Sequence, residues 1–471
     1  MIPIAAYRDR KVLLLGLARS NLAAARALRA GGAEVLGWDD GLAARDAAAG
    51  SGIAIVAPDA LDWPAIAALV AAPGVPLTHP APHPLVLAAR AAAVPVIGDI
   101  ELFMNSRPAG RIVGITGTNG KSTTTALIGH LLSAAGKANE VGGNIGRSVL
   151  DLQPLADDGT YVLELSSFQL DLTPSCHLDV AVLLNVSADH LDRHGSMEGY
   201  VAVKRRIFDR QVAGDHAVIG IDDDWTGSIF AELQAQSHPG LVPIAVGRHL
   251  MRGVSVLDGV LHEGPVPVCD LKGARTLPGQ HNWQNAAAAF AVARALGVSR
   301  DAATAALASF PGLPHRQEEI ATIAGVRFVN DSKATNGDAA ARALESYGRI
   351  YWIAGGRPKA DGLDAALPHL QSVRAAFLIG EAAEGFGTRL RAAGVTACQC
   401  GTLDAAVQAA FDRARQDGDA GAPGEAVVLL SPACASFDQF SDYEGRGERF
   451  RSLVLRLQDT AGAGLLGGAA A

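Results

Sequence analysis

Residues 111–136 read RIVGITGTNGKSTTTALIGHLLSAAG, and the rest of the chain is organised around them. A short apolar run, rich in β-branched residues, leads into a glycine loop. The apolar residues after the loop recur at helical spacing until Gly136. This order predicts a strand, a loop and a helix. Such a loop exposes backbone N–H groups to phosphate oxygens at the positive end of the helix.

The loop resembles a phosphate-binding loop, and we expect it to bind a nucleotide. Lys121 can reach the terminal phosphates, and the hydroxyl of Ser122 can hold Mg²⁺. The match is imperfect, because Ile115 stands where the first glycine of the pattern usually falls. A glycine turn that only joins a strand to a helix is the alternative. The expected nucleotide-binding residues are those of the loop and the first helical turn: Gly117, Thr118, Asn119, Gly120, Lys121, Ser122 and Thr123.

Composition limits the class of protein. A chain of 471 residues is too long for one ordinary core, so about three domains are expected. The net charge of −8 argues against a nucleic-acid partner. Five cysteines, an odd number, indicate free thiols in a reducing cytoplasm. We expect a cytoplasmic protein without membrane insertion, because there is neither a run of transmembrane length nor the apolar core of a signal peptide.

The first part of the chain, residues 11–40, predicts a Rossmann-like unit of strand, helix and strand. Asp39 lies about 20 residues after the first glycine, where an acid that reads a ribose often lies. Ala18 and Asn21 replace the other two glycines of the dinucleotide pattern, so a dinucleotide site is disfavoured. A nucleotide bound in another pose and a turn without any ligand both stay open.

Polar residues follow two buried strands of the central part. Glu164 ends one strand, and His190 follows the next. Ligands of parallel α/β sheets lie beyond the carboxyl ends of the strands, so both residues are expected near the phosphates, through Mg²⁺. Asn282 and Asn285 open an alanine-rich helix and can offer amide edges to a base, although close helix packing explains the alanines equally well.

The last part of the chain resumes the α/β alternation after a proline-glycine hinge at residues 312–318. The predicted fold class is therefore α/β with three domains. A Rossmann-like domain (1–108) is followed by a central P-loop ATPase-like domain with a parallel sheet (109–313) and a Rossmann-like C-terminal domain (314–471). The tail from about residue 459 is expected to be disordered. Arg316 and Lys333 can hold phosphate or carboxylate groups.

Eight stretches together resemble the Mur ligases in their order and spacing, and two of them, NDSKATN and the last, resemble the glutamate-adding branch in particular. The stretches are TGTNGKST, ELSSFQL, NVSADHLDRH, GQHNWQN, GLPHRQE, NDSKATN, GGRPKADG and LSPACASFDQF. The resemblance covers the chain from Lys11 to about Leu457. It implies a monomeric three-domain enzyme that uses ATP and Mg²⁺ to add D-glutamate to UDP-N-acetylmuramoyl-L-alanine through an acyl phosphate.

The resemblance also implies roles for individual residues. The catalytic residues would be Lys121, Glu164, His190 and Lys204. Lys204 matches a lysine that the family carbamylates, and the metal would be held by Ser122, Glu164, His190 and Lys204. The nucleotide would contact Asn282, Asn285, Arg316 and Asp331. The UDP-sugar would contact Asp39, Gly74, Asn144 and Gln169, and the amino acid would contact Lys333, Thr335, Lys359, Ser436 and Tyr443. From the residues alone, Lys204 would be assigned to a solvated helix face.

Three positions depart from the pattern of the family. The first turn is GLARSN rather than glycine-rich, Ala72 replaces a serine, and Tyr443 replaces a phenylalanine. Three alternatives are weighed against the glutamate ligase. Another ligase of the superfamily, including a folylpolyglutamate synthetase, is disfavoured by the C-terminal motif. A nucleotide-regulated binding protein would have no use for Lys204 and the pair Lys333 and Lys359. An NAD-dependent oxidoreductase is disfavoured by Ala18 and Asn21.

Overall fold

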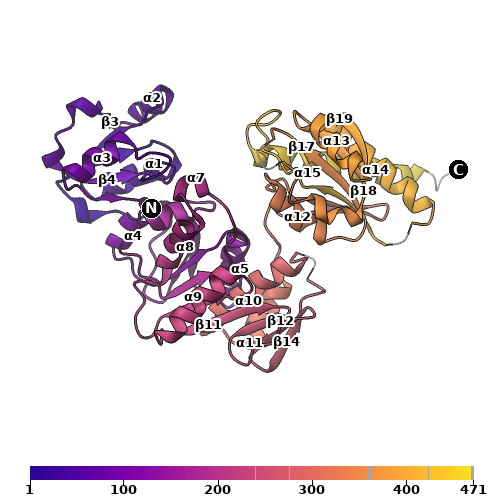
Figure 1. The fold of residues 1–471 in the computed structure, drawn as a ribbon, viewed down its shortest axis with the longest axis horizontal. Coiled ribbons are helices and arrows are strands. Elements are labelled where there is room, and N and C mark those ends of the chain that lie inside the picture. The colour runs from indigo at the N-terminus through magenta and orange to yellow at the C-terminus, as the bar shows by residue number, and fades with distance from the viewer. Residues whose placement is uncertain (239, 275, 359–361, 423, 468–471) are drawn as a thin grey trace. The chain divides into compact units, whose positions relative to one another are not determined.

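The computed structural model describes residues 1–238, 240–274, 276–358, 362–422 and 424–467. The chain forms an α/β structure with three sheets that follow one another along the sequence (Figure 1). The first sheet has five parallel strands in the order β3-β2-β1-β4-β5. Their bounds are β1 Lys11–Leu15, β2 Glu34–Trp38, β3 Ala54–Ile55, β4 Ile66–Ala71 and β5 Val96–Ile97. Its helices are α1 (Arg19–Ala30), α2 (Leu42–Gly50), α3 (Pro84–Ala91) and α4 (Asp99–Asn105).

The second sheet has nine strands in the order β14-β13-β12-β11-β10-β9-β6-β8-β7. It is parallel from β7 to β12, and β13 and β14 add an antiparallel edge. The bounds are β6 Arg111–Thr116, β7 Asn139–Gly143, β8 Thr160–Glu164, β9 Val180–Leu183, β10 His216–Gly220, β11 Leu241–Val246, β12 Val254–Leu257, β13 Val260–Glu263 and β14 Val266–Asp270. The helices are α5 (Lys121–Ala134), α6 (Ser167–Asp171), α7 (Leu191–His194), α8 (Met197–Arg205), α9 (Asp224–Ala235), α10 (Gln280–Ala295) and α11 (Arg300–Ala308).

The third sheet has six strands in the order β15-β16-β20-β17-β18-β19, and only the β15–β16 pair is antiparallel. The bounds are β15 Glu318–Ile323, β16 Val326–Asn330, β17 Ile350–Gly355, β18 Val373–Ile379, β19 Thr396–Gly401 and β20 Ala426–Leu430. The helices are α12 (Gly337–Glu345), α13 (Ala383–Ala392), α14 (Leu403–Asp419) and α15 (Tyr443–Gly467). Buried apolar clusters lie on both faces of this sheet, which explains why its parallel strands are almost wholly apolar.

The described chain divides into two compact units. The N-terminal unit consists of Met1–Ala274 and Asn282–Phe310, and the C-terminal unit consists of the remaining residues. The first two sheets belong to the same unit because they share one hydrophobic cluster. Phe103 of α4, for example, packs edge-on against Tyr161 of β8, with ring centroids 5.1 Å apart. Helix α10 begins in the C-terminal unit and continues in the N-terminal unit.

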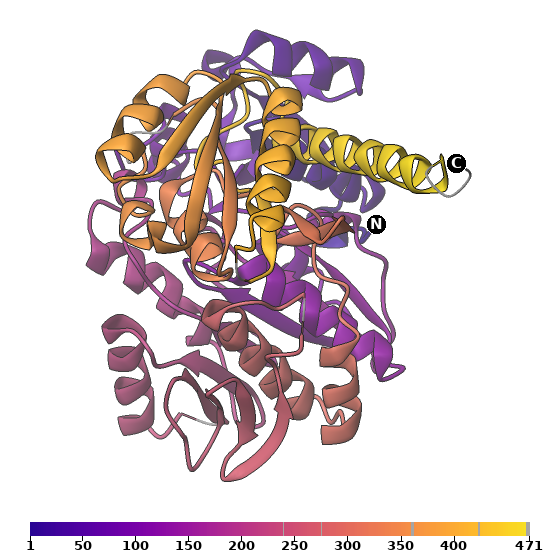
Figure 2. The ribbon, with the colours of Figure 1, turned by 90° about the vertical axis from the view of Figure 1, so that its right-hand side faces the viewer.

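Helix α15 is longer than the sequence analysis expected. It runs to Gly467, whereas a disordered tail was expected from about residue 459. Figure 2 shows it as one long helix that ends at the C-terminus of the described chain. Alanine and leucine favour the continuation, while the glycines at positions 462 and 464 oppose it. In the described part of the chain, no helix is long and apolar enough to cross a membrane.

Candidate active site around the nucleotide loop

The expected strand, loop and helix are confirmed: β6 ends at Thr116, and α5 begins at Lys121. Gly120 caps α5 with φ +83°, a left-handed conformation that glycine adopts without strain. An added Cβ at this position would lie 2.2 Å from Oδ1 of Asn285. The loop therefore requires glycine for its backbone conformation and for the close approach of α10.

The side chain of Lys121 folds back over the loop. Its Nζ donates to the carbonyl oxygens of Gly117 (2.9 Å) and Thr118 (2.8 Å). Ser122, the next residue, is buried. The ammonium group is thus held at the loop whose N–H groups are expected to receive phosphate.

Lys204 of α8 contacts the same loop. Its Nζ donates to the carbonyl of Gly117 (2.9 Å) and lies 3.4 Å from the hydroxyl of Thr116. The assignment to a solvated helix face is wrong, because Lys204 is 1% exposed and packs over the ring of Tyr200. Burial, and then the charge of Lys121, lower the pKa of Lys204 well below its usual value. Two lysines therefore converge on one backbone carbonyl.

Glu164 lies at the carboxyl end of β8, and one of its two carboxylate oxygens has no hydrogen-bond donor among the described residues. Its Oε1 accepts a hydrogen bond from Nδ2 of Asn144 (2.7 Å). Its Oε2 is buried and has no hydrogen-bond partner among the residues that the structure describes. A buried carboxylate oxygen without a donor is costly unless a cation or another donor satisfies it, so this atom fits the ligand set of Mg²⁺.

His190 precedes α7 with φ +53° and packs against Phe168, the ring centroids lying 4.9 Å apart. Burial lowers its pKa, which Asp189 raises in part and Lys121 and Lys204 lower further. The imidazole is thus favoured in the neutral form that can accept a hydrogen bond or a metal. Within the described residues, no three His, Cys, Asp or Glu side chains are grouped so that they could hold a metal ion by themselves.

Of the two α10 amides that were expected to face a base, Asn285 contacts the helix after the loop, and Asn282 contacts Asn285. Oδ1 of Asn285 accepts from the hydroxyl of Thr124 (3.2 Å). Nδ2 of Asn285 donates to Oδ1 of Asn282 (3.0 Å). Both residues are buried, and Asn285 also lies against Gly120. Asn285 therefore contacts the nucleotide loop at Gly120 and the following helix at Thr124.

Two further residues of this site were missing from the candidates chosen by sequence. Asn185, directly after β9, hydrogen-bonds to both backbone groups of Asn119, and Gln284 of α10 accepts from Asn185. An asparagine at the end of a buried strand was a usable signal for the first. Gln284 lies in the stretch GQHNWQN beside the chosen Asn285, but neither its residue type nor its spacing indicated a contact with the loop.

The four residues expected on the UDP-sugar side lie in the N-terminal unit. Asp39 accepts from the backbone N–H groups of Leu17 (2.7 Å) and Gly41 (2.8 Å), so it shapes the first turn. Gly74 has open space beside it. Asn144 holds Glu164, as described above. Gln169 is buried and closes the capping box of α6 with Ser166.

In the C-terminal unit, residues from three segments lie together. Asp331 follows β16, accepts from the hydroxyl of Ser431 (2.8 Å) and the N–H of Gln317 (3.2 Å), and is fully buried among them. Burial raises the pKa of Asp331 to about 7, which the bond from Ser431 and the charge of Arg316 oppose.

The expected amino-acid residues belong to the same unit. Nζ of Lys333 lies 5.1 Å from the centre of the Tyr443 ring, and the carbonyl of Tyr443 accepts from the hydroxyl of Ser332. The N–H of Thr335 donates to the carbonyl of Lys333. Ser436 is buried in the loop after β20. Lys359 lies outside the described residues.

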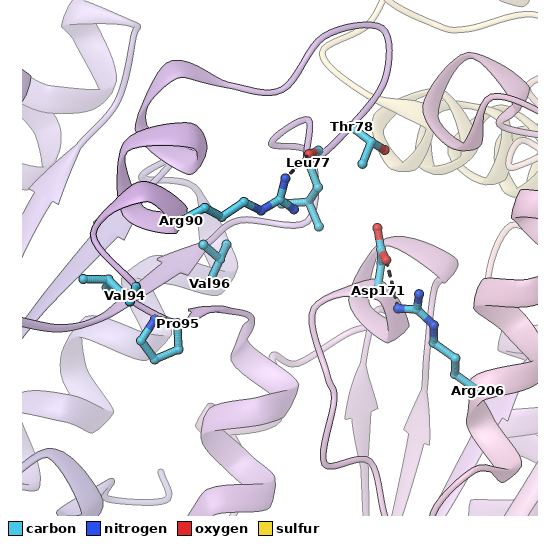
Figure 3. Close-up of a pocket in the computed structure, with 9 residues that line it drawn as sticks. Leu77, Thr78, Arg90, Val94, Pro95, Val96, Asp171 and Arg206 are labelled. Atoms are coloured by element: carbon cyan, nitrogen blue, oxygen red, sulfur yellow. Dashed lines mark hydrogen bonds and ion pairs between the residues drawn. The ribbon is translucent and has the colours of Figure 1, made fainter.

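A pocket of about 640 Å³ opens elsewhere in the N-terminal unit. Figure 3 shows Arg90 of α3 on one side, hydrogen-bonded to the carbonyl of Leu77, and Asp171 paired with Arg206 on the other. None of the expected site residues lines it.

Comparison with known proteins decides the family. The chain matches the models "Mur ligase middle domain" over residues 115–293 and "Mur ligase, glutamate ligase domain" over residues 315–434. A protein of Caulobacter vibrioides, named UDP-N-acetylmuramoylalanine–D-glutamate ligase, is 54% identical over 98% of this chain and 99% of its own length. The chain belongs to the Mur ligase family. A Rhodospirillum rubrum protein of the same name is 47% identical over 99% of both chains.

Solved Mur ligase structures share the fold. The UDP-N-acetylmuramate-alanine ligase of Thermotoga maritima has a TM-score of 0.56 at 19% identity, covering 96% of this chain and 99% of that one. A pseudomurein peptide ligase of Methanothermus fervidus has a TM-score of 0.52 at 19% identity, covering 95% of this chain and 100% of that one. The Mur ligase middle-domain match includes the nucleotide loop, Glu164, His190 and Lys204.

Proposed function

We propose that this Mur ligase adds D-glutamate to UDP-N-acetylmuramoyl-L-alanine at the expense of ATP, in the synthesis of peptidoglycan precursors. Full-length relatives that carry the corresponding name support the choice of substrates. The structural observation that carries the proposal is the convergence of Lys121 and Lys204 on the carbonyl of Gly117, beside the glycine loop. A site that only joined a strand to a helix would not gather two lysines there.

The reaction needs activation of a carboxylate, because a free carboxylate is a poor acylating agent. The terminal carboxylate of the UDP-sugar peptide attacks the γ-phosphorus of ATP, and the bond to the β-phosphate oxygen breaks, releasing ADP. The amine of glutamate then attacks the acyl phosphate, loses a proton and expels inorganic phosphate. Negative charge accumulates on phosphoryl oxygens, which Lys121 and the N–H groups of the loop stabilise.

The residues present fit Mg²⁺, which would neutralise phosphate charge in this site. Glu164, with its open oxygen, and Ser122 would hold one ion, with phosphate and water oxygens completing the shell. Lys204 would contribute a second set of oxygens as its carbamate, together with His190. A buried amine with a depressed pKa is the nucleophilic form that reacts with CO₂, and its product is an anionic oxygen ligand.

The domain assignment follows the chemistry. We assign the UDP-sugar to residues 1–108 and ATP to residues 109–313, each built on a Rossmann-like or P-loop sheet. Residues 314–471 would bind glutamate through Lys333, Thr335, Lys359, Ser436 and Tyr443, and would complete the ATP site with Arg316 and Asp331. We infer a cytoplasmic enzyme, since its substrates are small molecules of the cytoplasm, and we propose that it is a monomer.

The test is phosphate release from ATP with purified protein. Release is expected to require both UDP-N-acetylmuramoyl-L-alanine and D-glutamate, and L-glutamate in parallel reactions is expected to replace D-glutamate poorly. Equal release with either substrate omitted would show an ATPase rather than a ligase. Strong preference for another amino acid would place the chain in a different branch of the family.

A further inference from the structure

Asn185 holds the nucleotide loop through three hydrogen bonds, which are together called the clip. Its backbone carbonyl accepts from the N–H of Thr118 (2.9 Å), and its Oδ1 accepts from the N–H of Asn119 (2.9 Å). Its Nδ2 donates to the carbonyl of Asn119 (3.3 Å). Three hydrogen bonds thus fix two adjacent residues of a loop whose glycines leave it intrinsically flexible.

The amide of Asn185 works only in one orientation. Reversing it would set Nδ2 against the N–H of Asn119 and Oδ1 against its carbonyl, losing both side-chain bonds. The second hydrogen of Nδ2 points to Oε1 of Gln284, at 2.8 Å. Gln284 therefore favours the orientation of Asn185 that holds the loop.

The orientation of Gln284 is fixed in turn by Asp222, which follows β10. Nε2 of Gln284 donates to Oδ2 of Asp222 (3.3 Å), and the same oxygen accepts from the N–H of Val246 (3.0 Å). An oxygen that receives a backbone N–H is an acceptor, so it selects the donor end of the Gln284 amide.

We propose that Gln284 is a positioning residue for the nucleotide loop, which it holds through Asn185. The chain of hydrogen bonds runs from Val246 N–H through Asp222, Gln284 and Asn185 to Asn119, and every donor in it meets an acceptor. Gln284 is 9% exposed and Asn185 is partly buried, so water replaces the bonds of Gln284 poorly. Gln284 hydrogen-bonds to Asn185 and Asp222, neither of which is expected to contact phosphate. This inference rests on the proposal that the loop binds ATP.

The experiment measures the dissociation constant of ADP by calorimetry and the KM for ATP in the ligase assay. Gln284→Met keeps the length of the side chain but removes both hydrogen bonds. It is expected to weaken ADP binding and raise the KM for ATP about tenfold, the equivalent of about one such bond. The kcat should fall as well, because the N–H groups of the loop also stabilise the charge that accumulates on the phosphoryl oxygens in the transition state.

Gln211→Met is the matched control. Gln211 is a partly buried glutamine of the same unit whose Nε2 donates to the carbonyls of Leu178 (3.1 Å) and His216 (2.8 Å), away from the loop. Its replacement should lower the melting temperature and leave ADP affinity unchanged. Equal loss of ADP affinity in both variants would reduce the role of Gln284 to general stability and overturn the inference.

A double substitution tests the route through Asn185. Asn185→Ala removes the two side-chain bonds of the clip, so adding Gln284→Met to it should weaken ADP binding by no further factor. A second tenfold loss in the double variant would mean that Gln284 acts by another path, and the inference would fail. The calorimetric measurement needs no ligase activity. Normal ADP binding without glutamate-dependent turnover would therefore reject the proposed substrate and leave the clip to be judged on affinity alone.

Discussion

The most informative single residue is Lys204, because a long cationic side chain is almost never fully buried without a pairing charge. Its Nζ meets the carbonyl of Gly117, and another ammonium, that of Lys121, meets the same oxygen. Such an arrangement disfavours the charged form of the buried amine. Carbamylation would remove the conflict by replacing one cation with an anion.

We expect Lys204→Ala to lower the rate of glutamate-dependent phosphate release by roughly a hundredfold, the usual cost of removing one electrostatic contact to a reacting group. Short-chain carboxylic acids should restore part of that rate, because they can place an anionic oxygen in the vacated space. The measurement is steady-state turnover across an acetate or propionate series.

Arg205→Ala is the control for this substitution. Arg205 is the next residue of α8 and forms surface ion pairs with Asp209 and Glu232. Surface ion pairs contribute little, so this variant should keep nearly full activity and show no response to the acids. An active Lys204→Ala enzyme, or one indifferent to carboxylic acids, would speak against the carbamate.

The buried carboxyl group of Asp331 is expected to make the stability of the folded protein depend on pH. Burial raises its pKa from 3.8 to about 7, so between these values the folded protein keeps a proton that the unfolded chain releases. Its contribution to the stability of the folded state therefore falls as the pH rises through this window, by up to about 1.4 kcal/mol per pH unit. Asp331→Asn should flatten this fall in urea unfolding experiments performed between about pH 4 and about pH 7.

Asp338→Asn provides the comparison, because Asp338 is an exposed carboxylate in the same unit. It should leave the pH dependence of unfolding as it is in the parent protein. If Asp331→Asn and Asp338→Asn gave the same profile as the parent, the buried carboxyl would have to ionise normally.

At this scale the sequence predicted residue types better than it predicted their surroundings. Lys121 and Glu164 follow from motif and strand position, and the structure places both at the loop or at the end of a strand as expected. Lys204 does not follow, since three consecutive basic residues give no sign of which one turns inward. That choice depends on packing between α8 and the loop, which joins residues 87 positions apart.

At the scale of elements, the strand, loop and helix at residues 111–136 were predictable because each has a local signature. The β-branched strand, the glycines and the helical spacing all lie within 26 residues. The bracing of that loop by β9 and α10 was not predictable. Its hydrogen bonds join Asn119 to Asn185, 66 residues away, and Asn185 to Gln284, 99 residues further on.

Gly120→Ala tests the contact between the loop and α10. The variant must adopt φ +83° with a Cβ that would lie 2.2 Å from Oδ1 of Asn285, so the loop or α10 has to shift. We expect ADP affinity and the ligase rate to fall at least tenfold, as the N–H groups leave their phosphate positions. Calorimetry with ADP gives the affinity directly.

Gly136→Ala is the control that separates the effect of backbone strain from the effect of the steric contact with Asn285. Gly136 lies just beyond the other end of the same helix with φ +71°, and nothing lies within 4 Å of an added Cβ. The substitution should cost about 1 kcal/mol of stability through backbone strain and leave ADP affinity unaltered. Equal loss of affinity in the two variants would show that strain alone, without the contact to Asn285, explains the effect.

At the scale of the whole molecule, composition predicted three domains, and three sheets are present, yet the first two sheets share a core and form one unit. Length indicates how many sheets a chain can build, but it does not reveal whether two sheets bury apolar surface against each other. The residues assigned to ATP activation lie mostly in the N-terminal unit, and those assigned to glutamate lie in the C-terminal unit. The two proposed steps, activation of the carboxylate and delivery of glutamate, therefore depend on residues of different units.

This division predicts a change of shape during catalysis. The amine of glutamate must reach bonding distance of an acyl phosphate formed on the other unit, which requires the units to close on each other. The chain passes between the units near the start of α10 and again after Phe310, and the hinge would include residues 311–314, where two prolines flank the passage after Phe310. We expect the radius of gyration from small-angle scattering to fall when a non-hydrolysable ATP analogue and UDP-N-acetylmuramoyl-L-alanine are added together. Lys121→Ala, which loses the contact to the terminal phosphates, should show a smaller change under the same conditions. An unchanged radius in the parent protein with saturating ligands would mean that the two halves of the site are already joined in the free enzyme.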